Sequence, residues 1–182
     1  MKHKTMKHNT SIIFVTALLM IFSVSAFAAN SDLSGVWALD KAKSDGSSPE
    51  MNQIMTIKQT GENLSLETKI IMGGNENVFS RAYKLDGKEA EYAVNTTVST
   101  NTNSEEGDET VETTKKIKGK QTAKWTADGV EILELTNSIN GTGTVKIARK
   151  LTLSADGKTL TVNIKVESPT VKSETKLTFN KK

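Results

Sequence analysis

Apolar and polar residues alternate with the period of a β-strand along most of the chain after residue 32. The first such segment covers residues 33–39, where Leu33, Gly35, Trp37 and Leu39 share one face. Similar runs follow at 51–59, 64–72, 79–85, 90–98, 130–133, 145–153, 160–166 and 173–179. A short helical turn is expected only at 41–44. The pattern therefore predicts an all-β chain of roughly 8–10 strands.

Asp-Gly dipeptides separate several of these runs, at Asp86-Gly87, Asp128-Gly129 and Asp156-Gly157. Because Asp-Gly is a preferred hairpin turn, each dipeptide is expected to join two paired strands. Successive hairpins favour an antiparallel up-and-down β-barrel, whose closure would leave no exposed edge strand. Residues 101–109 are polar and acidic, and are expected to form a mobile loop.

Residues 1–28 have the three parts of a secretory signal peptide. Lys2, Lys4 and Lys7 precede an apolar run at 12–22, and Ser25-Ala26-Phe27-Ala28 supplies a small-x-small cleavage pattern. An uncleaved membrane anchor is the alternative, but the apolar run is short for a membrane span. We expect cleavage after Ala28, a single mature domain over 29–182, and a periplasmic or secreted location.

Removal of the signal peptide changes the charge balance. The chain has 24 basic and 21 acidic residues, and the three lysines that leave bring the mature protein close to neutrality. This removes the support for nucleic-acid binding. The few aromatic residues and the polar outer faces of the strands argue against an outer-membrane barrel.

The mature chain also lacks the side chains of the common catalytic and zinc sites. It has no cysteine, and its two histidines, His3 and His8, lie in the predicted signal peptide. The acidic residues between 105 and 109 do not have the fixed spacing of a calcium loop. We therefore expect a protein that is not an enzyme and that holds no metal and no cofactor.

The first strand carries a resemblance to a known family. The run Ser34-Gly35-Val36-Trp37-Ala38-Leu39-Asp40, with Lys43 and Ser44 after it, resembles the opening of small bacterial exported lipocalin-like proteins. This resemblance implies a lipocalin-like, calycin-type barrel, and it adds no assigned role. It also implies that a basic residue of a late strand stacks on the Gly-x-Trp indole. Arg149 is the residue expected to form this structural plug with Trp37.

Two features depart from the relatives of this barrel. Lipocalins place a helix after the eighth strand, whereas here the strand pattern continues to the C-terminus. Fatty-acid-binding proteins insert a pair of helices after the first strand, and residues 41–50 leave little room for them.

Arginine occurs at only two positions, Arg81 and Arg149, and both are in phase with apolar neighbours. Arg81 shares a strand face with Phe79 and Tyr83, and Tyr92 follows on the next strand. A guanidinium and a phenol on one face can hold a carboxylate while apolar neighbours receive a chain or ring. Fatty-acid-binding proteins use a similar Arg-x-Tyr pair on a strand near the C-terminus. The alternatives for Arg81 are a structural ion pair with an internal carboxylate and a side chain turned to solvent.

Two functions remain open from the sequence. The first is an extracytoplasmic binding module that holds a small hydrophobic or amphipathic ligand, with or without a carboxylate, inside the barrel. Its expected ligand-binding residues are Arg81, Tyr83, Phe79 and Tyr92. The second is a non-enzymatic interaction protein with a filled barrel, which binds another protein or a cell-surface polymer through its loops. The sequence does not indicate the oligomeric state.

Overall fold

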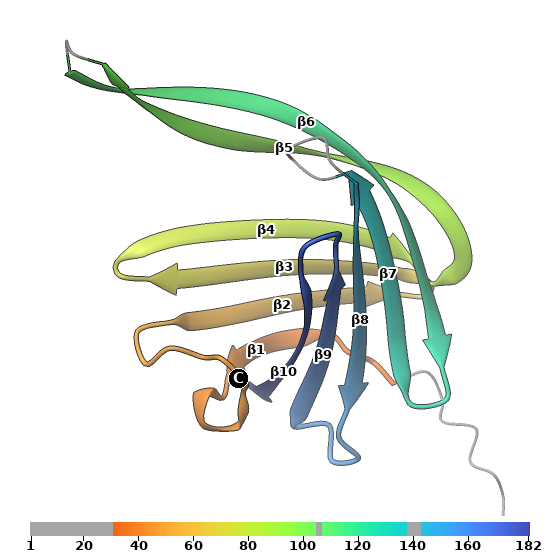
Figure 1. Cartoon of the computed structure of the whole chain (residues 1–182). Helices are drawn as coiled ribbons and strands as arrows, with labels where there is room; N and C mark the ends of the chain where they lie inside the picture. The colour runs from red at the N-terminus through yellow and green to blue at the C-terminus, as the bar shows by residue number, and fades with distance from the viewer. Residues whose placement is uncertain (1–30, 105–106, 138–142) are drawn as a thin grey trace, which may run out of the picture.

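The computed structural model describes residues 31–104, 107–137 and 143–182 (Figure 1). The predicted signal peptide, residues 1–28, lies outside this part of the chain. The elements are β1 (Gly35–Leu39), the short 3-10 helix η1 (Lys41–Lys43), β2 (Asn52–Thr60), β3 (Asn63–Met72), β4 (Asn75–Lys84), β5 (Asp86–Ser104), β6 (Gly107–Thr126), β7 (Gly129–Asn137), β8 (Thr144–Leu153), β9 (Thr159–Glu167) and β10 (Lys172–Lys181). None of the described residues forms a helix long and apolar enough to cross a membrane.

The ten strands form one antiparallel sheet in the order β4-β3-β2-β1-β10-β9-β8-β7-β6-β5. Each strand except β4 and β5 therefore pairs with the strands next to it in sequence, and β1 pairs with β10 to join the two ends of the chain. Figure 1 shows the sheet curled on itself, so that β1–β4 lie across β7–β10. The prediction of an all-β, antiparallel, up-and-down barrel with 8–10 strands is confirmed. The turn expected at 41–44 is η1.

The barrel is open between β4 and β5, which are the two edge strands of the sheet. The prediction of a hairpin at Asp86-Gly87, and with it a fully closed barrel, is wrong. Asp86 already stands opposite Lys124 of β6, and the register shifts between Asp86 and Glu89. The Asp86 carboxylate accepts hydrogen bonds from the Lys88 amide at 2.9 Å and pairs with Lys84 at 3.0 Å. These contacts hold a bend that directs β5 onto β6 instead of back along β4.

The other two Asp-Gly predictions are confirmed. Asp128-Gly129 joins β6 to β7, with Thr126 opposite Gly129. Asp156-Gly157 lies between β8 and β9, which pair from Leu153 and Leu160 onward.

The loop predicted at 101–109 is wrong over the residues that the structure describes. β5 continues to Ser104, β6 begins at Gly107, and Asn103 stands opposite Asp108. The flanking segments are rich in threonine and valine, which favour strands, and their backbone ladder extends through the polar residues. In Figure 1 this hairpin projects beyond the body of the barrel.

The packed core occupies the end of the barrel where β2 joins β3, β6 joins β7, and β8 joins β9. The side chains fully buried there are Leu33, Trp37, Ile57, Leu64, Val130, Leu160 and Phe179. The Trp37 indole Nε1 donates a hydrogen bond to the Leu33 carbonyl oxygen at 3.0 Å. This buried bond satisfies the polar atom of the largest core side chain.

The plug on Trp37 differs from the one that the resemblance implied. The cation over the indole is Lys181, whose Nζ lies 5.2 Å from the ring centroid and which stands opposite Trp37 in the β1–β10 pair. A Cβ at Gly35 would lie 2.9 Å from Lys181 Cε, so glycine leaves space for the lysine stem. The expectation that Arg149 stacks on Trp37 is wrong, because Arg149 is paired with Glu134 farther along the barrel. A basic residue of the last strand fills this role.

Candidate functional site

A cavity of about 260 Å³ lies inside the barrel, beside the apolar core. Most of its wall is apolar and comes from β2, β3, β4, β8, β9 and β10. The apolar lining residues are Met55, Leu66, Ile70, Phe79, Leu151, Val162, Ile164 and Leu177, and the polar ones are Gln53, Thr68, Arg81, Tyr83 and Arg149. Such a mixture of apolar wall and a few convergent polar groups is typical of small-molecule sites.

Glu134 is the centre of the polar part of this site. Its side chain is 4% exposed, and it accepts a hydrogen bond from Tyr83 Oη at 3.1 Å. Arg149 Nη1 donates to Glu134 Oε2, and Arg81 Nε lies 3.6 Å from Glu134 Oε1. One buried carboxylate therefore faces two guanidinium groups and one phenol.

Strand geometry explains how these side chains meet. Arg81 and Tyr83 stand two residues apart on β4 and so share its inner face. Arg149 of β8 stands opposite Ile132 of β7, which places it diagonal to Glu134 on the same face. The ion pair and the tyrosine hydrogen bond thus connect β4 to β7 and β8. They span the opening between the edge strands, together with a 2.8 Å hydrogen bond from Gln121 Nε2 to the Ala82 carbonyl oxygen.

Tyr92 completes the surroundings of Arg81. The Arg81 Cζ atom lies 5.6 Å from the centroid of the Tyr92 ring, which is within the range of a cation–π contact. Gly119 stands opposite Tyr92 on β6, and a Cβ there would lie 2.6 Å from Tyr92 Cζ. The glycine is therefore needed for the ring to lie over the strand beside the arginine.

Both tyrosines are held in the protonated form. Burial, together with the Glu134 carboxylate, raises the pKa of Tyr83. The pKa of Tyr92 is raised by the same two causes, with burial the larger. A neutral phenol is required for Tyr83 to donate to Glu134, so the shift and the hydrogen bond agree.

The cluster carries one surplus positive charge, because a single carboxylate faces two guanidinium groups. The arginine side chains keep part of their surface accessible, 34% for Arg81 and 28% for Arg149. The surplus charge is therefore available to an anion that enters the cavity.

Comparisons with known proteins assign no family to this chain. The sequence matches no protein-family model, and no curated protein matches it significantly. Among solved structures, the chain is similar to human cRBP IV, with a TM-score of 0.41 and 15% sequence identity over 84% of this chain and 99% of that protein. The fold is defined by the strand order and the β1–β10 pairing described above.

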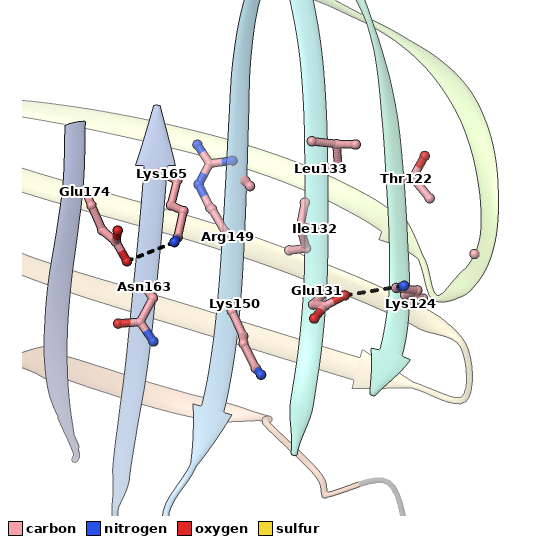
Figure 2. Close-up of a pocket in the computed structure, with 12 residues that line it drawn as sticks. Thr122, Lys124, Glu131, Ile132, Leu133, Arg149, Lys150, Asn163, Lys165 and Glu174 are labelled. Carbon is pink, nitrogen blue, oxygen red and sulfur yellow. Dashed lines mark ion pairs between the residues drawn. The ribbon is translucent and has the colours of Figure 1, made fainter. Parts of the chain in front are cut away.

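A larger hollow of about 720 Å³ lies on the outer face of β6–β10 (Figure 2). Its charged side chains pair with each other across neighbouring strands, with Lys124 3.4 Å from Glu131 and Lys165 3.2 Å from Glu174. Most of these residues alternate with the inward-facing ones, although Ile132 and Arg149 also reach the hollow, and Lys150 pairs with Asp128 beside it at 2.7 Å. This surface has the character of a solvated outer face, so the interior cavity is the better candidate site.

The predicted site residues lie close together in the structure. Arg81, Tyr83 and Phe79 line the cavity, and Tyr92 contacts Arg81 from the neighbouring hairpin. Phe79 is 52% exposed and stands at the open side. Among the described residues, no group of three or more histidine, cysteine or acidic side chains is placed to hold a metal ion.

Sequence reasoning missed Glu134. It is in phase with Val130 and Ile132, which are buried on β7. An acidic residue at an apolar position of a strand is the same signal that singled out the two arginines. Applied to acidic residues, it would have predicted their internal counter-ion.

Proposed function

We propose that the open half of the barrel, which contains the cavity and the ion-paired cluster around Glu134, binds a small amphipathic molecule that carries one carboxylate. The observation that supports this proposal is the surplus positive charge of Arg81 and Arg149 at the wall of a mostly apolar cavity. A counter-ion strongly stabilises a charged group that is partly removed from water. No group of the site is assigned a catalytic step, and the proposed activity is binding alone.

The cavity also sets the size of the ligand. About 260 Å³ is just below the range of about 300–1,000 Å³ that is usual for drug-sized ligands. At roughly 30 Å³ for each water-sized group, it holds on the order of nine non-hydrogen atoms. A medium-chain fatty acid or a single-ring aromatic acid fits this volume, with its apolar part against Ile70, Ile164 and Leu177.

Arg81 is the side chain that we assign to the ligand carboxylate. Its guanidinium is the more exposed of the two, and Nη1 donates only to a solvent-exposed backbone oxygen, that of Ser80, at 3.0 Å. Turning this group toward a bound carboxylate would replace a hydrogen bond to a neutral carbonyl oxygen with one in which both partners are charged. Tyr92 would then support the guanidinium from behind.

The test is the displacement of a fluorescent fatty acid by octanoate, with wild type, Arg81→Gln and Lys150→Gln compared. Lys150 is the neighbour of Arg149 on the outer face, so its variant is a control for the loss of one positive charge. We expect the affinity of Arg81→Gln to fall about tenfold or more while that of Lys150→Gln is unchanged. Equal binding by all three proteins, or no binding to any, would remove the proposal.

We further propose that the mature protein begins at Ala29 and acts in the periplasm or outside the cell. The signal-peptide pattern of residues 1–28 supports this location. N-terminal sequencing of the major species from the native host tests it. A major species that retains residue 1 would contradict export with cleavage.

A second candidate function is an interaction protein that binds its partner through its surface. Two observations favour it. Glu134 already pairs with both arginines, and the edge strand β4 exposes Val78 and Phe79, each 52% accessible. Native mass spectrometry of protein purified from its own host separates the two functions, because the first expects a retained small molecule and the second a protein or polymer.

A further inference from the structure

We infer that Glu134 restricts the site to ligands with a single negative charge. The inference rests on the proposed function and concerns its specificity. In this inference Glu134 acts as a permanent anion inside the site and neutralises one of its two positive charges.

The geometry pairs Arg149 with Glu134 and leaves Arg81 for the anionic group of the ligand. Arg149 makes the closer contact with Glu134, and its side chain is the less exposed of the two. Arg81 is farther away, at 3.6 Å, and more accessible from the cavity. Glu134 therefore stays with Arg149 and Tyr83, while Arg81 is left to pair with the ligand.

Charge balance then selects the ligand. A neutral ligand would cover Arg81 with apolar atoms and supply no counter-ion for the surplus positive charge of the cluster. A dianion would bring one uncompensated negative charge next to Glu134, since the site offers one positive charge in excess. A monoanion leaves no unpaired charge, and an unpaired charge is the arrangement that a buried site penalises most.

Specificity by repulsion requires that the repelling group cannot move away. Glu134 is 4% exposed and is held by hydrogen bonds from β4 and β8. Its side chain therefore cannot turn to solvent when an anion enters. Discrimination against an unwanted ligand commonly depends on such a fixed unfavourable contact.

Three ligands with the same alkyl chain test the inference. They are 1-octanol, octanoate and hexylmalonate, which is octanoate with a second carboxylate on its α carbon. Binding is measured by isothermal titration calorimetry at pH 8, where hexylmalonate is a dianion. For wild type we expect octanoate to bind at least about tenfold more tightly than either of the others.

Glu134→Gln keeps the size of the side chain and removes its charge, so the site then carries two surplus positive charges. We expect the ratio of hexylmalonate to octanoate affinity to rise about tenfold or more in this variant. Glu131→Gln is the matched control, because Glu131 lies on the same strand and faces outward. Its ratio should equal that of wild type.

A double variant, Glu134→Gln with Arg149→Gln, restores one surplus charge and avoids an unpaired Arg149. It should prefer octanoate again, and it tests the inference even if the single variant does not fold. An unchanged ratio in a folded Glu134→Gln, or in a folded double variant a preference for hexylmalonate, would overturn the role of Glu134 while leaving the proposed site intact. No binding of any of the three ligands to wild type would instead overturn the proposed function and this inference with it.

Discussion

The two halves of this barrel use the same strands for different purposes. Along β8 the inward side chains change from the buried Leu151 to the partly exposed Arg149, and along β4 they change from the buried Tyr83 to the half-exposed Phe79. The closed half, which contains the core around Trp37, is filled by its own side chains, as a small barrel can be. The open half retains a cavity of about 260 Å³ and the ion-paired cluster around Glu134. The core around Trp37 and the cluster with the proposed binding role therefore occupy different parts of the same sheet, and Leu151, Val162 and Leu177 belong to both the core and the cavity wall.

This division follows from what each half can bury. Apolar side chains from β1, β7, β9 and β10 meet around Trp37 and exclude water, which is the main stabilising term in folding. In the open half, two guanidinium groups and a carboxylate take the place of apolar side chains. Such ion pairs contribute little net stability, because removing the charges from water costs about as much free energy as their attraction gains. Substitutions in the closed half should thus change the free energy of unfolding, and substitutions in the open half should change binding.

The largest expected effect is that of Trp37→Ala. Removal of a fully buried tryptophan typically costs about 3–5 kcal/mol, which approaches the total stability of a small domain. We expect the variant to unfold or to melt far below wild type in thermal denaturation followed by circular dichroism. Val36→Ala is the control, since Val36 is the neighbour of Trp37 on the exposed face. Equal melting temperatures for Trp37→Ala and wild type would contradict a core centred on the closed half.

An intermediate effect is expected at Tyr83, which stands between the two halves. Tyr83→Phe removes a buried hydrogen bond to a carboxylate, and such bonds contribute about 1.5–3 kcal/mol. The unfolding free energy from urea denaturation at pH 7 should fall by this amount. For Tyr92→Phe, whose ring is more exposed, the unfolding free energy should decrease by less.

The same substitution has a consequence at alkaline pH. The folded pKa of Tyr83 is raised by burial and by Glu134, while the unfolded phenol titrates near its ordinary value of 10.0. The unfolded state therefore loses its proton first, and stability that is present below pH 10 decreases as the pH rises above it. Wild type should lose stability more steeply than Tyr83→Phe in this range. Parallel curves would show that Tyr83 is not held protonated by its surroundings.

The closed half could be predicted from sequence better than the open half, for a physical reason. Alternation along a strand reports burial on one face, and that is how the strands, Trp37 and the inward position of Arg81 were found. The local sequence does not indicate which residues meet across the barrel. The phase of Glu134 with buried residues of β7 predicts that it points inward, but Glu134 stands 51 residues from Tyr83 and the local sequence does not indicate that these two side chains meet.

Turn chemistry and composition failed in a similar way. Asp86-Gly87 does form a tight bend, but the bend alone does not decide whether β4 and β5 pair afterwards. The partner of Trp37 was misassigned because Lys181 and Arg149 are both basic residues of late strands, and only the register places Lys181 opposite the indole. In residues 101–109 polar composition predicts a loop, whereas the adjoining strand-forming residues extend the ladder as far as Ser104 on β5 and Gly107 on β6.

The smallest effect on stability is expected at Phe79, and the comparison with Phe179 isolates it. Both are phenylalanines with inward positions on their strands, but Phe179 is fully buried in the closed half and Phe79 is 52% exposed at the open side of the cavity. Phe179→Ala should cost about 3–5 kcal/mol, because it leaves a cavity in a packed core. Phe79→Ala should cost less than about 1 kcal/mol, because much of its ring already contacts water. Under the proposed function, Phe79→Ala should nevertheless weaken octanoate binding several-fold, since its ring covers part of the cavity wall. Urea denaturation and octanoate titration of the same two variants measure both quantities. A large loss of stability in Phe79→Ala would show that the open half is part of the core, and the contrast between the two halves would then be wrong.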